Sequence, residues 1–363
     1  MKRLLLVAGA RPNFVKVGPL MRECRRHPDK VDVRLVHTGQ HYDPEMSRTF
    51  FEEFGIPDPD WHLGVGSGSH AAQTARIMTA FEEVLLGWRP DVVVVVGDVN
   101  STLACSVTAR KMQIRVAHVE AGLRSFDSTM PEEINRLVTD AISDILFATE
   151  KSAVDNLLRE GRSAEAIHLV GNVMIDTLHY CLTRLDDVPG KRVQGPYAVV
   201  TLHRPSNVDD ALKLRGILDA LCVIARDMPI HFPMHPRTRR KMEENGLQPL
   251  IAGAGIQVLP PVSYMDFLRL WKDATLVLTD SGGVQEETTA LGVPCFTIRD
   301  NTERPVTIDE GTNVLAGTTR EGILEHYGRF RSGQTKAGRV PHLWDGKAAE
   351  RIVSVLMESG EVR

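Results

Sequence analysis

The sequence has few cysteines and no arrangement of them that would cross-link a fold or hold a metal. Its five cysteines show no CxxC pair and no regular spacing: Cys24, Cys105, Cys181, Cys222 and Cys295. Disulfide frameworks and structural zinc sites need paired or clustered thiols. We therefore expect reduced cysteines, a cytoplasmic protein and no structural zinc.

Long apolar runs are also missing. The start, MKRLLLVAGARP, is similar to a signal peptide, but Arg11 interrupts its short apolar run before any cleavage site of small residues. No apolar segment approaches the ~20 residues needed to span a bilayer. We interpret the start as a first buried strand and expect no membrane partner.

Neither sign of charge predominates, and several cofactor motifs are absent. A net charge of -4 argues against a general nucleic-acid binder. The first turn reads GARPNFVK rather than GxGxxG, which disfavours NAD. His37 and His41 flank a Thr-Gly turn and no HExxH is present, so we predict no metal.

Short apolar runs alternate with amphipathic stretches along the whole chain. A run such as residues 92–96, which is apolar at every position, indicates a strand of a parallel sheet with both faces covered by helices. A first set comprises residues 4–7, 31–36, 92–96, 116–119 and 145–148. A second set comprises residues 198–201, 230–232, 256–259, 276–279 and 295–298.

Two doubly wound α/β domains follow from this repeat, because 363 residues exceed the usual size of a single core. We place a first Rossmann-like domain at residues 1–170 and a second at residues 171–345. The final amphipathic segment, 346–363, is expected to pack back on the first domain. Such sheets bind ligands beyond the carboxyl ends of their strands, so the two domains are expected to face a common cleft.

The segment TLVLTDSGGVQEETTALG joins an apolar strand to a helix through Ser281, Gly282 and Gly283. Glycines let a phosphate approach the backbone, and the first amides of the helix point towards it. Glu286 and Glu287 follow one turn later, where carboxylates would reach sugar hydroxyls. The segment predicts a nucleotide site, with an ordinary strand-to-helix turn as the alternative.

Charged residues follow the apolar runs of the first domain. Arg11 and Lys16 lie near the start of the first helix, where two cations would hold a diphosphate. Asp98 ends the most apolar strand, and capping of the next helix is the favoured interpretation of its motif taken alone. Glu120, in RVAHVEAGLRS, interrupts a strand near its end, with Arg124 as a candidate partner and a role as acid or base.

Two further motifs supply candidates. In MPEEINR, Glu132 and Glu133 lie in the first turn of a predicted helix, and Glu132 is spaced for an ion pair with Arg136. This motif is explained equally well by helix stability or by function. His203, in VVTLHRPSN, closes the first strand of the second domain and is a candidate for proton transfer.

Nine segments taken together resemble the non-hydrolysing UDP-N-acetylglucosamine 2-epimerase family. They occur in order over nearly the whole chain: GARPNFVK, HTGQHYD, GDVNSTLA, HVEAGLRS, MPEEINR, TLHR, TDSGGVQEE, GVPCFTIRDNTERP and WDGKAAERI. The resemblance implies two Rossmann-like domains that face a cleft, as in GT-B glycosyltransferases. It also implies a homodimer that binds a UDP-sugar and needs no cofactor.

The resemblance assigns roles to matching residues. The diphosphate would bind Ser281, Gly282 and Gly283, the ribose Glu287 and the uracil Phe267, with Arg304 near the nucleotide. Arg11, Lys16 and Arg136 match substrate-binding positions. Catalytic positions fall on Asp98, Glu120, Glu132 and His203.

The implied reaction is anti elimination of UDP to a 2-acetamidoglucal, followed by return of UDP and reprotonation at carbon 2. Departures from the commoner pattern, such as Asn13 and the HTGQHYD segment, leave it open whether this chain has a second, activating UDP-sugar site. Relatives with this type of start include epimerases of diacetamido uronic acid nucleotides, for which Arg204 and Arg237 are candidate carboxylate ligands. A hydrolysing epimerase, a UDP-sugar glycosyltransferase and a UDP-sugar binding module are the remaining alternatives.

Overall fold

The computed structural model describes residues 1–39, 51–187 and 193–358. Contacts between residues divide them into two compact units, one formed by residues 1–182 and 342–363 and the other by residues 183–341. The predicted boundary at residue 170 lies twelve residues before the division at residue 182, because most of α7 (Val173–Arg184) belongs to the first unit, and the predicted boundary at residue 345 lies four residues after residue 341. Within the described residues no helix is long and apolar enough to cross a membrane.

The first unit is built on a parallel sheet of seven strands in the order β3-β2-β1-β4-β5-β6-β7. Its strands are β1 (Lys2–Ala8), β2 (Val31–His37), β3 (Trp61–His62), β4 (Val92–Val96), β5 (Arg115–Ala121), β6 (Ile145–Ala148) and β7 (Ile167–Leu169). All five valines of β4 are buried, because helices cover both faces of the sheet. The first set of apolar runs is therefore confirmed as strands.

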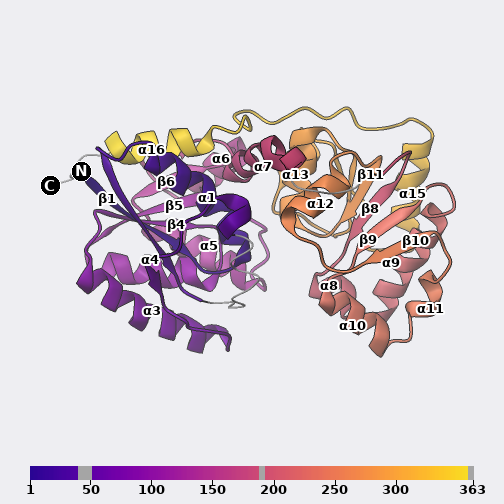
Figure 1. The fold of residues 1–363 in the computed structure, drawn as a ribbon, viewed down its shortest axis with the longest axis horizontal. Helices are drawn as coiled ribbons and strands as arrows, with labels where there is room; N and C mark the ends of the chain where they lie inside the picture. Colours follow the sequence, from indigo (N-terminus) through magenta and orange to yellow (C-terminus); the bar gives the residue numbers. More distant parts are fainter. Residues whose placement is uncertain (40–50, 188–192, 359–363) are drawn as a thin grey trace. The chain divides into compact units, whose positions relative to one another are not determined.

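The helices of the first unit lie on both faces of this sheet (Figure 1). Among the described residues they include α1 (Arg11–Arg25), α3 (His70–Gly87), α4 (Asn100–Lys111), α5 (Pro131–Ile142), α6 (Lys151–Arg159), α7 and α16 (Ala348–Glu358). Helices α3, α4 and α5 pack in a row, while the C-terminal helix α16 packs beside α1. Asp176 of α7 accepts hydrogen bonds from the backbone amides of Ala348 and Ala349, and these bonds fix the start of α16.

The second unit has a parallel sheet of six strands in the order β10-β9-β8-β11-β12-β13. Its strands are β8 (Ala198–Thr201), β9 (Ile230–Pro233), β10 (Ile256–Leu259), β11 (Leu276–Thr279), β12 (Cys295–Thr297) and β13 (Asn313–Leu315). Its helices are α8 (Pro205–Val208), α9 (Ala211–Ile224), α10 (Pro236–Glu244), α11 (Gln248–Ile251), α12 (Tyr264–Trp271), α13 (Gly282–Leu291), α14 (Pro305–Asp309) and α15 (Arg320–Arg331). Helices α9 and α15 pack against each other over one face (Figure 1).

Three strands were not predicted: β3, β7 and β13. They have two or three residues each and lie at sheet edges, where they are only partly buried. Such short segments carry too little apolar sequence to give a period. The prediction of two doubly wound α/β domains is nevertheless confirmed by both sheets.

Candidate active site

The carboxyl ends of three neighbouring strands bring together charged residues of the first unit. Strands β1, β4 and β5 are adjacent in the sheet, and Lys16, Asp98 and Glu120 lie at or just beyond their carboxyl ends. Lys16 projects from α1 and forms an ion pair with Glu120, through Nζ and Oε2. Both side chains are buried. This pair is therefore shielded from water and electrostatically strong.

Glu120 has a backbone conformation that side chains other than glycine rarely adopt. Its φ is +71°, and the register of β5 against β6 shifts between Val119 and Ala121. A bulge of this kind redirects a side chain, and the conformation costs roughly 1–3 kcal/mol. Strain of this size at a buried carboxylate is typical of functional positions.

One oxygen of Glu120 has no hydrogen-bond partner in the part of the chain that the structure describes. Oε2 is paired with Lys16, whereas Oε1 is buried and accepts no hydrogen bond from the described residues. A buried acceptor without a donor is unfavourable and calls for an explanation. An oxygen left open in this way can receive a proton, which fits the predicted role of Glu120 as acid or base.

Gly97 provides the space in which Lys16 and Glu120 meet. Its φ is +66°, and a Cβ atom at this position would lie 2.9 Å from Lys16 Nζ and 3.6 Å from Glu120 Oε2. The carbonyl of Gly97 faces His118 Nε2 at 2.8 Å, and His118 Nδ1 lies 2.6 Å from Asp140. The turn after β4 is thus tied to β5 and α5 below the ion pair.

Asp98 is held by Arg136 rather than by a helix terminus. Helix α4 begins after the N-cap residue Val99 and has no side-chain cap, so the capping prediction for Asp98 is wrong. Arg136 Nη1 binds Asp98 Oδ2, and Arg136 Nη2 lies 2.6 Å from Glu133 Oε2. The Asp98 side chain remains 28% exposed, which leaves it accessible to a ligand.

Helix α5 carries its polar residues on the buried side. Its buried residues are Glu133, Asn135, Arg136, Thr139 and Asp140. Ile134, Leu137 and Val138 are instead 51%, 42% and 37% exposed. A helix on the surface of a soluble domain normally has the opposite arrangement. The inward face of α5 therefore serves the site rather than an apolar core.

Two predicted ion pairs of the first unit are wrong. Arg136 pairs with Glu133, three residues earlier, while Glu132 is exposed on the first turn of α5. Arg124 does not contact Glu120 but lies 2.7 Å from Asp140 and 2.6 Å from Glu160. Both predictions relied on the separation of the two residues along the chain. This separation does not show in which direction the side chains point.

Other residues named from the first domain play different parts. Arg11 begins α1, and its side chain lies outside the part that the structure describes, as does the whole of His41. Asn13 fixes the β1–α1 turn, since its Oδ1 accepts hydrogen bonds from two backbone amides and its Nδ2 donates one to the carbonyl of Val96. His37 contacts His62, and burial lowers the pKa of His37 to about 4. In the described ranges no group of three metal-ligating side chains is placed to hold an ion.

In the second unit, the predicted phosphate-binding turn leads into helix α13. The helix starts at Gly282, and its N-cap residue Ser281 makes no side-chain cap. The first amides of the helix are thus left for an anion, which the positive end of the dipole favours. Ser281, Gly282 and Gly283 all occupy this terminus, as the sequence predicted.

Asp280, which precedes this turn, organises the end of β8. It is fully buried and accepts hydrogen bonds from the backbone amides of His203 and Arg204, at 3.0 and 2.9 Å. His203 Nδ1 lies 2.9 Å from Asp280 Oδ1, and the His203 side chain is 39% exposed. Burial alone would raise the pKa of Asp280, but the hydrogen bond and charge of His203 and the amides hold it below the usual value. His203 is thus oriented by a buried carboxylate.

Three arginines gather beside the start of α13. Arg204 and Arg299 both contact Glu303, at 3.0 and 2.7 Å, and Arg304 binds Glu286 at 2.6 Å. Arg299 and Arg304 are buried, and Arg204 is partly exposed. Arginine binds phosphate and carboxylate through the same planar donors. A phosphate at the start of α13 would therefore lie among arginines as well as backbone amides.

Glu287 lies one turn into α13 and is buried. The hydroxyl of Tyr264, on α12, donates to its carboxyl at 2.6 Å. Burial raises the pKa of Glu287 to about 8, and nearby Glu286 adds to the rise, while the Tyr264 hydrogen bond opposes it. Phe267 follows Tyr264 by three residues on α12, so the two side chains share a face of that helix.

The raised pKa of Glu287 predicts a fall in stability with pH. The unfolded carboxyl ionises near 4.5 and the folded one near 8. Between these values unfolding releases a proton, so the free energy of unfolding falls by about 1.4 kcal/mol per pH unit. Glu287→Gln removes this contribution and flattens the curve from pH 5 to pH 8 in urea unfolding. The exposed Glu321→Gln serves as the control, and an unchanged slope in Glu287→Gln would contradict the assignment.

Comparison with known proteins decides the family. A family model described as UDP-N-acetylglucosamine 2-epimerase matches residues 22–357. This chain belongs to the UDP-N-acetylglucosamine 2-epimerase family. The UDP-N-acetylglucosamine 2-epimerase of Methanocaldococcus jannaschii is 42% identical over 98% of both chains. Its crystal structure in complex with UDP-GlcNAc and UDP gives a TM-score of 0.86 at 41% identity, covering 98% of this chain and 99% of that one.

A second relative has a different sugar substrate in its name. The UDP-2,3-diacetamido-2,3-dideoxy-D-glucuronate 2-epimerase of Pseudomonas aeruginosa is 41% identical over 98% of this chain and 99% of its own length. A UDP-glucosyltransferase of Polygonum tinctorium shares the fold at 11% identity, with a TM-score of 0.60 and 99% of each chain covered. The predicted family and the GT-B-like fold class are thus confirmed.

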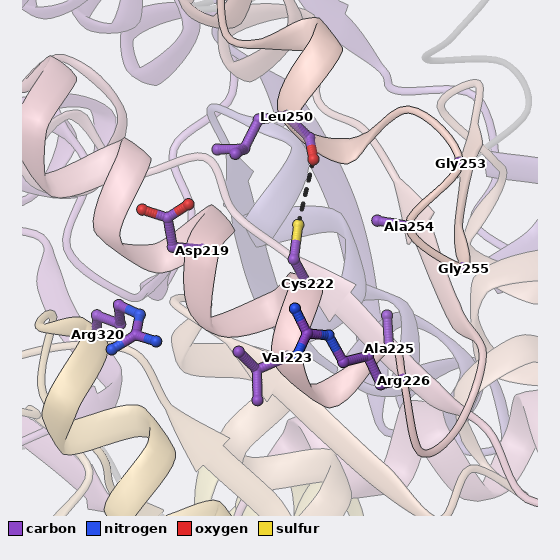
Figure 2. Close-up of a pocket in the computed structure, with 10 residues that line it drawn as sticks. All are labelled: Asp219, Cys222, Val223, Ala225, Arg226, Leu250, Gly253, Ala254, Gly255 and Arg320. Carbon is purple, nitrogen blue, oxygen red and sulfur yellow. Dashed lines mark hydrogen bonds between the residues drawn. The ribbon is translucent and has the colours of Figure 1, made fainter.

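A cavity of the second unit is separate from these residues. It has a volume of about 850 Å³ and is lined by residues of α9, the segment after α11 and Arg320. Figure 2 shows Cys222 at its centre, with Sγ donating to the carbonyl of Leu250 at 3.4 Å. None of the residues that match the epimerase family's motifs lines it, so we do not assign the nucleotide to this cavity.

The structure adds four residues to which sequence reasoning gave no role at the site. Glu133 holds Arg136, Tyr264 holds Glu287, and Glu303 with Arg299 extends the charged group at α13. Glu303 and Arg299 lie in the TIRDNTERP segment of the epimerase family, of which only Arg304 was chosen. The position of Arg299 directly after the apolar run 295–298 was the available signal, and Glu303 follows Arg299 by four residues.

Proposed function

We propose that this chain interconverts UDP-N-acetylglucosamine and UDP-N-acetylmannosamine without releasing the sugar from UDP in the net reaction. The observation that carries the proposal is the buried Lys16–Glu120 pair, in which Oε1 of Glu120 accepts no hydrogen bond from the described residues and can accept a proton. The chain belongs to a family of epimerases, whose reaction needs such an acceptor. Elimination followed by re-addition at carbon 1 requires such a group for the proton at carbon 2.

Residues of the second domain hold UDP in this proposal. The diphosphate binds the amides of Ser281, Gly282 and Gly283, and Arg304 contributes positive charge. The carboxyl group of Glu287 accepts hydrogen bonds from the ribose hydroxyls, and Phe267 packs against the uracil. Support comes from the uncapped start of α13 and from the position of Tyr264, which fixes Glu287.

Residues of the first domain act on the sugar. The bond from carbon 1 to the diphosphate oxygen breaks, the proton leaves carbon 2, and a 2-acetamidoglucal with UDP results. A proton then returns to carbon 2 on the opposite face as UDP re-adds to carbon 1. Asp98, Glu120 and Glu132 are the acid and base set of this proposal. Their support is the clustering of Asp98 and Glu120 and the exposed position of Glu132 on α5.

Cations assist departure of the leaving group. Arg11, Lys16 and Arg136 are the substrate-binding cations of the first domain in this proposal, and His203 supplies a proton-transfer group from the second. Negative charge on the departing diphosphate grows in the transition state, so cations that bind it lower the barrier to elimination.

The nucleotide of a diacetamido uronic acid is the second candidate substrate. The 41% identity to the Pseudomonas aeruginosa enzyme nearly equals the 42% identity to the archaeal one. Arg204 and Arg237, the two predicted uronate ligands, already pair with Glu303 and Asp209. Arg237 is thus occupied by a surface carboxylate, and Arg204 lies in the charged group where we place the diphosphate, so neither is left for a uronate and the uncharged sugar is favoured. A comparison of kcat/KM for the two nucleotides tests the choice, and product that retains UDP excludes the hydrolysing alternative.

We also propose a cytoplasmic homodimer that supplies activated N-acetylmannosamine for surface polysaccharide. The apolar residues Ile134, Leu137 and Val138 on the outer face of α5 support self-association, because exposed apolar groups of this kind mark interfaces.

A charge on this face is expected to separate the subunits. Leu137→Glu places a carboxylate within the outer face of α5, and burial of an unpaired charge at an interface is costly. Light scattering should then report the mass of one chain in place of two. Leu212→Glu, at a leucine that is 83% exposed on α9, is the matched control and should remain dimeric. A Leu137→Glu variant with the native mass would exclude α5 from the interface.

A further inference from the structure

Glu303 occupies an unusual place for an acidic residue. It lies between β12 and α14 and is 6% exposed. A Cβ atom built on Gly282, the first residue of α13, would lie 3.3 Å from Glu303 Oε1. A carboxylate oxygen therefore stands directly beside the helix terminus to which we assign the diphosphate.

One arginine beside Glu303, Arg299, is incompletely satisfied. Arg204 Nη2 donates to Glu303 Oε1 at 3.0 Å. On the other side, Arg299 Nη1 and Glu303 Oε2 are 2.7 Å apart, yet both atoms are buried and form no hydrogen bond with the described residues. The ion pair is thus close in distance but poorly aligned, which leaves a buried donor of Arg299 available to another acceptor.

Local electrostatics keep Glu303 ionised. Burial alone would raise its pKa, but the charges of Arg304, Arg204 and Arg299 lower the pKa to about 2. Burial lowers the pKa of Arg299. Glu303 therefore carries a full negative charge at neutral pH, at a place where we propose that a second anion binds.

We propose that Glu303 acts as an internal counter-anion of the diphosphate site: it holds Arg204 and Arg299 while the site is empty and yields them to the diphosphate of a UDP-sugar. The inference rests on the proposed function, because it concerns the same site. Glu303 is a positioning residue, since it acts through the arginines and not on the reacting atoms.

In this role Glu303 would lower the affinity for UDP and thereby speed product release. The diphosphate must be held during elimination and returned to carbon 1, and the product must then leave. Three arginines and a free helix terminus would bind a nucleoside diphosphate tightly in both ground state and transition state. Uniform tightness lowers KM without raising kcat and slows product release. A fixed carboxylate beside the site opposes such tightness.

The proposal predicts a gain of affinity on loss of a contact. Glu303→Gln removes the competing charge and leaves Arg204 and Arg299 without their anion, so both changes favour UDP. Calorimetric titration should show UDP bound about tenfold more tightly than by the native protein. The variant should also gain more in melting temperature from saturating UDP, and its kcat and KM for the UDP-sugar should both fall. If Glu303 only supported the local fold, UDP binding would weaken.

Two further variants keep the test decisive. Glu310→Gln removes a carboxylate that pairs with Arg339 on the surface of the same domain and should bind UDP as the native protein does. Glu303→Asp retains the charge but draws it back by one methylene group, and it serves if Glu303→Gln does not fold. Tighter UDP binding by Glu303→Asp than by the native protein supports the proposal, and weaker binding overturns it.

The outcomes separate this inference from the proposed function. If the native protein does not bind UDP at all, the proposed function fails together with the inference. If the native protein binds UDP and Glu303→Gln binds it equally or more weakly, the inference alone is overturned.

Discussion

Replacement of Glu120 by glutamine is expected to lower kcat by about 10³-fold, within the usual range for loss of a general acid or base. Glutamine has nearly the same shape as glutamate but cannot exchange a proton at carbon 2. The strained backbone at φ +71° and the burial of Glu120 already hold this side chain in place, so the loss should fall on kcat more than on KM. Steady-state assay with UDP-N-acetylglucosamine measures the change.

The interpretation depends on separating chemistry from folding. Glu120→Gln also removes the ion pair with Lys16, so circular dichroism and UDP titration must show that the variant is folded and binds nucleotide. Glu82→Gln, on the exposed side of α3, is the matched control and should leave kcat unchanged. A Glu120→Gln variant with kcat within threefold of the native value would remove Glu120 from the acid and base set.

Arg136→Met is expected to destabilise the first domain by about 3–5 kcal/mol, because it leaves a buried carboxylate without its cation. Arg136 is 2% exposed and bridges Asp98 and Glu133. Methionine fills a similar volume, so the effect reports charge rather than a cavity. Since Arg136 also holds Asp98, activity should fall as well. Urea unfolding measures the loss of free energy.

The pH dependence identifies the cause of this loss. Burial raises the pKa of Glu133, but amides of Ser125 and Phe126 and the charge of Arg136 bring it below the usual value. A depressed pKa stabilises the fold above the carboxyl's unfolded pKa and ceases to do so as the pH falls. Without Arg136 the pKa of Glu133 rises, so the deficit should be smaller at pH 5 than at pH 7.5. The exposed Arg26→Met is the control, and an equal deficit at both pH values would point to packing instead.

Local patterns in the sequence were sufficient for the sheets and for the turn before α13. The five valines of β4 can only be a strand covered on both faces, and Ser281 with Gly282 directly precedes a helical period. These features depend on neighbours within one turn or one strand. They therefore follow from composition and periodicity alone.

Partners from distant segments could not be predicted in the same way. Asp98 was expected to cap its own helix, but α5 brings Arg136 to it from 38 residues further along the chain. Glu303 contacts Arg204, which precedes it by 99 residues. The outward apolar face of α5 inverts the usual pattern, because its inward face carries the charges of the site. Such pairs are set by sheet order, which a single sequence does not reveal.

The central claim is a proton exchange at carbon 2 of a UDP-sugar that keeps its nucleotide. Proton NMR of the purified protein with UDP-N-acetylglucosamine in heavy water tests it most directly. We predict loss of the carbon 2 proton signal as deuterium enters, together with a UDP-linked manno product. Free sugar and UDP without a UDP-linked manno product, or a retained carbon 2 proton after prolonged incubation, would contradict the account.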